Sequence, residues 1–249
     1  MLVLLSFAAV LISSTVVVVG TVFHLWDWYS RHANWRTAEY RKLDSLIAGF
    51  SLEQFKTTLG SPIFVQVARK SHLVESTFRG RGFWVQTISD NDGVVRSYAV
   101  TSCSRTFRPS FRLGTELLVL QQTTFAEVAR QFGGGVVVDY FLSGATANSY
   151  FLESFYGGNP TNYKTYGWGI DDACPARSDP YGYFGHRRPL FQEYHGELSG
   201  LPRVAREFRA AAAVNTYVET APGADIEQIR RSFQIGVDRI LVRTVPPAA

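Results

Sequence analysis

The pattern of apolar residues changes sharply along the chain, and its first section is uniformly apolar. Residues 2–25, LVLLSFAAVLISSTVVVVGTVFHL, contain no Asp, Glu, Lys or Arg. A helix needs roughly 20 apolar residues to cross the hydrocarbon core of a bilayer, so this run predicts a transmembrane anchor over residues 1–26. Trp26, Trp28 and Tyr29 follow, where aromatic side chains contact lipid headgroups. A cleaved signal peptide is the alternative, but its apolar region is usually shorter and no Ala-x-Ala cleavage site follows the run.

Apolar residues at helical spacing characterise the next section, residues 27–48. Asn34 is a suitable N-cap and Gly49 a suitable stop, and few Gly, Pro or Ser residues stand between them. The section therefore predicts a juxtamembrane helix with one apolar stripe, formed by Trp35, Tyr40, Leu43, Leu46 and Ile47.

Residues 49–103 combine one short capped helix with alternating strand patterns. Ser51 and Gln54 have the spacing of a capping box, and Gly60 is placed to end the helix in a left-handed conformation. Strands are then expected at residues 63–68, 73–79, 83–89 and 94–101, with a hairpin turn at residues 90–93.

A second unit with the same signals follows over residues 123–174. Thr124, Glu127 and Gly133 each stand 73 positions after the corresponding residue of the first helix. Equal spacing of helix boundaries favours an internal repeat. Further strands are expected at residues 115–121, 136–140, 149–156 and 163–170.

The C-terminal part, residues 200–246, has a different order. Pro202 predicts the start of a helix that reaches residue 213, and a strand is expected at residues 213–219. Asp225 opens another helix, and residues 238–245 are expected to form a final strand that closes the sheet by a βαβ crossover. The preceding residues, 179–200, are rich in Gly, Pro, Tyr and His and predict a long surface loop.

Composition agrees with a globular domain behind the anchor. Of the 249 residues, 46% are hydrophobic and 18% charged. We therefore expect an α+β fold: an N-terminal transmembrane helix, then an antiparallel sheet with short capped helices, with two tandem repeats as one interpretation, and a C-terminal strand-helix-strand. The soluble domain would span residues 49–249. The formal net charge of +4 is too mild to predict a nucleic-acid partner.

The first unit resembles a known module. Its matching residues are Gly49, Phe50, Ser51, Glu53, Gln54, Phe55, Leu59, Gly60 and Pro62, then Asp90, Asp92, Gly93 and Val95. This pattern is similar to the helix-plus-sheet repeat of β-lactamase-inhibitor proteins and of the BamE/SmpA outer-membrane lipoproteins. The resemblance covers about 55 residues and implies a fold used for protein binding, without catalytic residues to carry over. This chain lacks the lipidated cysteine of those lipoproteins, and as a whole it resembles single-pass bacterial membrane proteins.

The charges beside the predicted anchor indicate an orientation. Arg31, Arg36, Arg41 and Lys42 all follow the apolar run and no cation precedes it, so the positive-inside rule predicts a cytoplasmic domain. An extracytoplasmic domain is the alternative. The two cysteines, Cys103 and Cys174, fit either orientation, as a disulfide outside the cytoplasm or as reduced thiols within it.

Catalytic signals are weak. Asp171 and Asp172 with His186 or His195 form a conceivable acid–base set for a membrane-anchored hydrolase. Adjacent aspartates more often just end a strand, and the histidines and cysteines lack the close spacing of metal ligands. The sequence therefore predicts no metal site and no cofactor.

A basic and aromatic group offers a better candidate for binding. Arginines beside exposed tyrosines suit an anionic ligand or an acidic partner, although a solvated helix face with glutamate counter-charges is the simpler reading. We therefore expect a membrane-anchored binding or interaction domain that recognises a protein or an anionic ligand; a hydrolase, or a homo-oligomeric component of a membrane assembly, is the alternative. The group comprises Tyr181, Tyr183, His186, Arg187, Arg188, Arg203, Arg206 and Arg209.

Overall fold

The structure is a computed structural model, and it describes residues 34–114, 116–132, 134–141, 150–159, 162–174 and 193–245. The chain divides into two units, Met1–Arg41 and Lys42–Ala249. The second unit contains the sheet and every site described below. The predicted transmembrane anchor, residues 2–25, lies outside the described residues.

The helices are short. They are α2 Trp35–Asp44, α3 Leu52–Leu59, α4 Phe125–Ala129, α5 Arg203–Ala211, α6 Ile226–Ser232 and α7 Arg239–Arg243, with a 3-10 turn η3 at Leu198–Gly200. The strands are β1 Phe64–Val67, β2 Val74–Gly80, β3 Phe83–Ser89, β4 Val95–Ser102, β5 Ser110–Leu113, β6 Glu116–Val119, β7 Val136–Phe141, β8 Tyr150–Tyr156, β9 Thr165–Asp171, β10 Glu193–Glu197 and β11 Thr216–Thr220. The fold is therefore α+β, as predicted.

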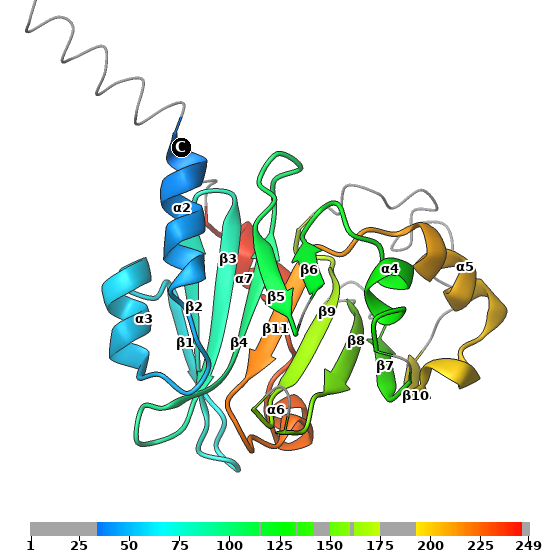
Figure 1. The fold of residues 1–249 in the computed structure, drawn as a ribbon. Helices are drawn as coiled ribbons and strands as arrows, with labels where there is room; N and C mark the ends of the chain where they lie inside the picture. Colours follow the sequence, from blue (N-terminus) through cyan, green and yellow to red (C-terminus); the bar gives the residue numbers. More distant parts are fainter. Residues whose placement is uncertain are drawn as a thin grey trace, which may run out of the picture. The chain divides into compact units, whose positions relative to one another are not determined.

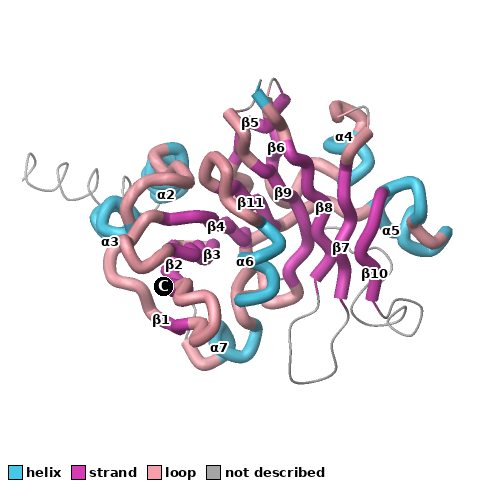
Figure 2. The backbone as a smooth tube through the Cα atoms, turned by 90° about the horizontal axis from the view of Figure 1, so that it is seen from below, coloured by secondary structure: helices cyan, strands magenta, loops and turns pink. Residues whose placement is uncertain are grey.

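Among the described residues, nine strands form one antiparallel sheet in the order β1-β2-β3-β4-β11-β9-β8-β7-β10, and β5 pairs with β6 in a separate hairpin. Strands β1 and β10 lie at opposite ends of the row (Figures 1 and 2). Strand β11 joins the two halves. Every residue of β11 is buried, and it pairs with β4 on one side and with β9 on the other.

Glycines in β9 allow close approach of its neighbours, β8 and β11. An added Cβ at Gly169 would lie 2.6 Å from the Phe151 carbonyl oxygen, and one at Gly167 would lie 3.1 Å from the Val218 Cβ. The space is used by Leu152 and Val218, which pack with Ala99 and Ile235. Fully burying one such aliphatic side chain contributes about 2 kcal/mol.

The sheet has two covered faces. We call the first the helix face: α3, α4 and the β5–β6 hairpin contact it through Phe55 on Tyr98, Phe125 on Phe151 and Phe111 on Tyr217. The opposite face, which we call the C-terminal face, is covered by chain from α6 onward. Ile229 packs there on Leu73 and Ile88, and Val237 packs on Trp84 and Cys174.

The helix-and-sheet units around α3 and α4 do not share one topology. Because β11 is antiparallel to both β4 and β9, those two strands point the same way. The meander β2-β3-β4 approaches β11 from one side and β7-β8-β9 from the other, whereas α3 and α4 lie on the same face. Superposing the first meander on the second requires a half-turn about an axis parallel to the strands. This half-turn exchanges the two faces of the sheet and would place α3 on the face opposite α4. The tandem repeat interpretation is therefore wrong for the topology, and only the local capping signals recur.

These capping signals behave as the sequence indicates. The Ser51 side chain accepts a hydrogen bond from the Gln54 N–H, and Gly60 follows α3 with φ of 90°. The capping box of α4 is complete, because Thr124 and Glu127 each accept a bond from the other's backbone N–H. The starts of both helices and the end of α3 were predictable for this local reason. Helix α4 ends at Ala129, before the stop predicted at Gly133.

Two predictions for the C-terminal third are wrong. Within residues 238–245, helix α7 (Arg239–Arg243) forms instead of a strand, so the described strands include no βαβ crossover that closes the sheet. The Asp238 carboxylate accepts the Leu241 N–H, which starts a helical turn, and Val242 and Val245 reach the Trp84 cluster at helical spacing. The predicted loop over residues 179–200 includes edge strand β10, which pairs with β7.

The two cysteines are joined in a disulfide across a sequence separation of 71 residues. Cys103 follows β4 and Cys174 follows β9, the strands on either side of β11. Asn215, at the start of β11, donates to the Asp171 and Cys174 carbonyl oxygens. The disulfide therefore fastens the two halves of the sheet at one end of the central strand.

Replacing both cysteines, Cys103→Ser with Cys174→Ser, is expected to lower the free energy of unfolding by about 4 kcal/mol, from the entropy of closing a loop of this length. Urea denaturation measures the change, and reduced wild-type protein serves as the control because it should unfold like the double variant. A double variant as stable as the oxidised wild type would contradict the disulfide.

Candidate functional site

A cleft of about 500 Å³ opens on the helix face over β4 and β11. We call it the Glu219 cleft, after the carboxylate in its wall. Its lining combines apolar, phenolic and charged side chains from four separate segments, and its residues are Leu43, Asp44, Leu46, Tyr98, Ser110, Phe111, Arg112, Leu117, Tyr217 and Glu219.

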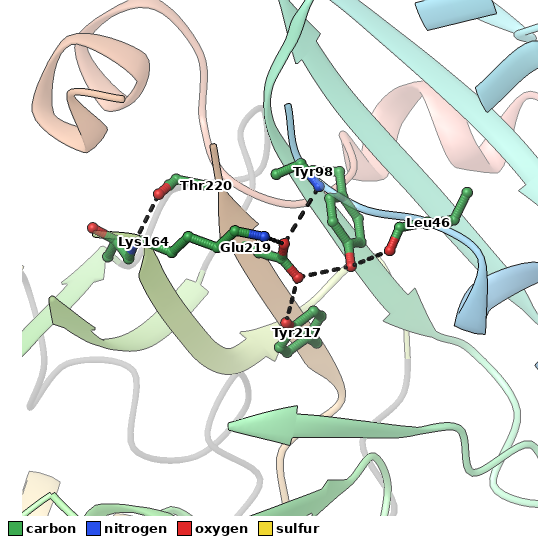
Figure 3. A network of polar contacts seen from close by, with 8 residues as sticks. Leu46, Tyr98, Lys164, Tyr217, Glu219 and Thr220 are labelled. Carbon is green, nitrogen blue, oxygen red and sulfur yellow. Dashed lines mark hydrogen bonds and ion pairs between the residues drawn. The ribbon is translucent and has the colours of Figure 1, made fainter. Parts of the chain in front are cut away.

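Strand pairing explains how the carboxylate and the phenols meet. Tyr217 and Glu219 are two residues apart on β11 and therefore share the helix face. Tyr98 lies directly opposite Glu219 on β4. The Glu219 carboxylate thus lies between two phenol side chains, as Figure 3 shows.

Both carboxylate oxygens of Glu219 are engaged. Oε1 lies 2.5 Å from the Lys164 ammonium and accepts the Ala48 N–H at 3.4 Å. Oε2 accepts the Tyr217 hydroxyl at 2.9 Å and lies 3.2 Å from the Tyr98 hydroxyl. Because the Lys164 and Glu219 side chains are only 12% and 10% exposed, this ion pair is shielded from solvent.

The Tyr98 hydroxyl has two acceptors and one proton. It lies 3.2 Å from the Leu46 carbonyl oxygen and 3.2 Å from Glu219 Oε2. A phenol donates one hydrogen bond, so it serves one acceptor at a time. The Tyr98 hydroxyl therefore lies between the Leu46 carbonyl oxygen and the Glu219 carboxylate and can donate to either.

Burial raises the pKa of both phenols well above the usual value near 10. For Tyr98, the charge of Glu219 raises the pKa further. For Tyr217, the neighbouring Tyr98 and then Glu219 add to the effect of burial. Both side chains therefore remain protonated donors at neutral pH, with fixed positions.

The rim of the cleft is more open than its wall. Phe111 of β5 stacks on Tyr217 with ring centroids 4.1 Å apart. Leu117, opposite Arg112 in the hairpin, is 54% exposed. Arg112 and Asp44 are also exposed. A molecule that enters would meet an apolar rim with charges of both signs before it reached the phenols.

The arginines predicted to form one basic surface have different environments. Arg203 is exposed and lies 3.5 Å from Glu207, while Arg206 donates to the Leu201 carbonyl oxygen. Arg209 is inside the fold, paired with the buried Glu153. The other members, Tyr181, Tyr183, His186, Arg187 and Arg188, lie outside the described residues and stay predictions.

The structure gives the predicted acid–base residues separate partners. Asp171 is 1% exposed, its Oδ1 accepts the Ala173 N–H, and burial raises the pKa of its carboxyl well above the usual range. His195 Nδ1 lies 3.9 Å from Asp139 and 3.3 Å from Arg230 instead. Asp171 therefore has a structural role in the turn after β9.

The sequence did not single out Glu219, Tyr98 or Tyr217. One signal was present: the run TYVET places a tyrosine and a glutamate at alternate positions of a strand that is otherwise typical of a core. A buried carboxylate needs partners, but apart from Tyr217 the partners of Glu219 are Ala48, Tyr98 and Lys164, which lie far away in sequence.

The described residues show neither a metal site nor a membrane span. Within those ranges, no group of three or more His, Cys, Asp or Glu is placed to hold a metal ion. No helix within them is long and apolar enough to cross a membrane.

Comparison with known proteins gives little further guidance. No protein-family model matches the chain, and no curated protein matches it. A solved structure from Streptococcus mutans, described as a candidate β-lactamase inhibitor protein, is 15% identical and covers 49% of this chain and 76% of its own, with a TM-score of 0.23.

Substituting Glu219→Gln is expected to destabilise the domain by about 3 kcal/mol, because it leaves the shielded Lys164 ammonium without a carboxylate. The matched control is Glu53→Gln, which breaks an exposed pair with Lys56 and should cost less than about 1 kcal/mol. Urea denaturation of both variants makes the comparison, and equal stabilities would contradict a buried pair at Glu219.

Proposed function

We propose that this chain is a membrane-anchored binding domain whose Glu219 cleft receives a side chain of a partner protein. The observation that carries the proposal is an open cleft with a preorganised polar wall and an exposed leucine at its rim. Recognition sites commonly combine apolar contact area with a few fixed polar groups. Here the apolar part is Leu117 and Phe111, and the polar part is Tyr98, Tyr217 and Glu219.

The state of Glu219 favours binding over catalysis. A general base needs an oxygen that is free to accept a proton from substrate. Glu219 Oε1 is paired with Lys164, and Oε2 accepts the Tyr217 hydroxyl. Proton transfer would break these contacts, whereas binding through the phenols and the rim leaves them intact. The partner's anchor is best an aromatic or aliphatic side chain with a polar end.

Membrane attachment rests on the apolar run of residues 2–25. For the orientation we adopt the extracytoplasmic alternative, supported by the Cys103–Cys174 disulfide. Disulfides persist in oxidising compartments and are rare in the cytosol. The charges after the apolar run favour the opposite orientation, but a covalent bond that closes the central part of the sheet is the stronger constraint.

A photo-crosslinking residue in place of Leu117 tests the cleft. In cells it should capture a discrete partner, because Leu117 is at the rim. The matched control is the same probe at Tyr156, a strand residue that is 59% exposed and outside the cleft. Leu117→Asp should then weaken binding of the captured protein at least tenfold, about 1.4 kcal/mol. Equal capture from both positions would contradict the proposal.

Cysteine labelling in intact cells tests the orientation. A maleimide that cannot cross membranes should label Cys103 and Cys174 only after the cells are treated with a reductant, because both thiols are in the disulfide. Lysed cells provide the control for total reactivity. Labelling that needs lysis but no reductant would place the domain in the cytoplasm with free thiols.

A further inference from the structure

Strand β1 presents an unusual edge. It pairs with β2 alone and ends the row of strands in the described part of the chain. Three apolar side chains at alternate positions are solvent-exposed beside it: Ile63 by 45%, Val65 by 57% and Val67 by 62%. Phe64, between them, packs with the Trp84 cluster on the C-terminal face and holds the strand against the sheet.

The opposite edge is protected in the usual way. In β10, Glu193, His195 and Glu197 are exposed at alternate positions. Charged side chains on an edge strand oppose pairing with another chain. By contrast, residues 60–68 contain no charged residue. The sheet therefore has one edge that discourages strand addition and one edge that permits it.

We propose that β1 pairs with β1 of a second copy of this chain, antiparallel and around a two-fold axis at Val65. A two-fold axis normal to the sheet leaves the helix face of both copies on one side of the joined sheet. Side chains that lie opposite each other must then belong to the same face, so an odd-numbered residue of β1 must face an odd-numbered residue of the partner. Centring on Val65 meets this condition. Ile63 then lies opposite the partner's Val67, and Val65 opposite the partner's Val65.

The composition around β1 makes this pairing self-complementary. The three exposed apolar residues, Ile63, Val65 and Val67, are symmetric about the axis, so each meets an apolar residue of the other copy. Cross-strand pairs of β-branched residues stabilise antiparallel sheets. The nearest cations, Arg69 and Lys70, would lie opposite Ser61 and Gly60 of the partner subunit, so no like charges face each other.

This surface is separate from the Glu219 cleft. None of the residues that line the cleft belongs to β1. The dimer would join two nine-stranded sheets edge to edge and leave each cleft open on its own helix face. Failure of the partner-capture experiment at Leu117 would therefore not affect the β1 pairing, and failure of the pairing would not affect the cleft.

Disulfide trapping of the full-length chain tests the register. Val65→Cys, oxidised mildly in the membrane or in detergent, should give a covalent dimer as the main product. The native cysteines are already paired, so they do not compete. Tyr156→Cys is the matched control, because Tyr156 is a strand residue of similar exposure that lies outside both β1 and the cleft. No more dimer from Val65→Cys than from this control would overturn the proposal.

A charge variant provides an independent measurement. Val65→Lys with Val67→Lys places like charges across the axis and should convert the dimer to monomer in light scattering. Both side chains are exposed, so the monomer should keep its fold and its circular dichroism spectrum should stay unchanged. An unaltered dimer mass would overturn the proposal and assign self-association to another part of the chain. A Val65→Cys crosslink to a different protein would also overturn the proposal, because it would show that another protein pairs with β1.

Discussion

The domain depends on one buried strand, β11, and on the charge it carries. This strand joins two meanders that would otherwise be separate sheets, and its Glu219 is 8% exposed. A buried carboxylate is tolerated only with partners. Those partners, Lys164, Tyr98, Tyr217 and Ala48, come from both sides of the strand. Satisfying Glu219 therefore brings the chain at Ala48 and strand β4 together at the wall of the cleft.

A second ion pair places the helices of the other half. Glu153 of β8 is fully buried and accepts hydrogen bonds from Arg209 of α5 and from the Trp168 indole. Arg209 also donates to the Phe125 carbonyl oxygen, which ties α5 to α4. In this half a buried acid thus ties α5 and, through Arg209, α4 to the helix face, while aromatic side chains supply much of the packing.

The prediction of the fold succeeded where the cause was local. The caps of α3 and α4, the turn before β4 and most strands of the first unit follow from residues close together in the chain. It failed for residues 238–245, where the composition is typical of a strand but the structure has a helix. The Asp238 side chain caps the start of this helix, and its valines pack on Trp84. It also failed for the repeat, because capping signals do not encode the direction from which a meander joins the sheet.

The sequence by itself determined the class: an apolar run, then an α+β domain of short capped helices and antiparallel strands. It could not determine the cleft. Glu219 was one acidic residue in an apolar strand until pairing brought Tyr98 and Lys164 beside it, 121 and 55 positions away. Hydrogen bonds within a turn link near neighbours, whereas desolvation of a charge depends on what tertiary packing brings together. The tertiary structure alone therefore decided where the cleft forms.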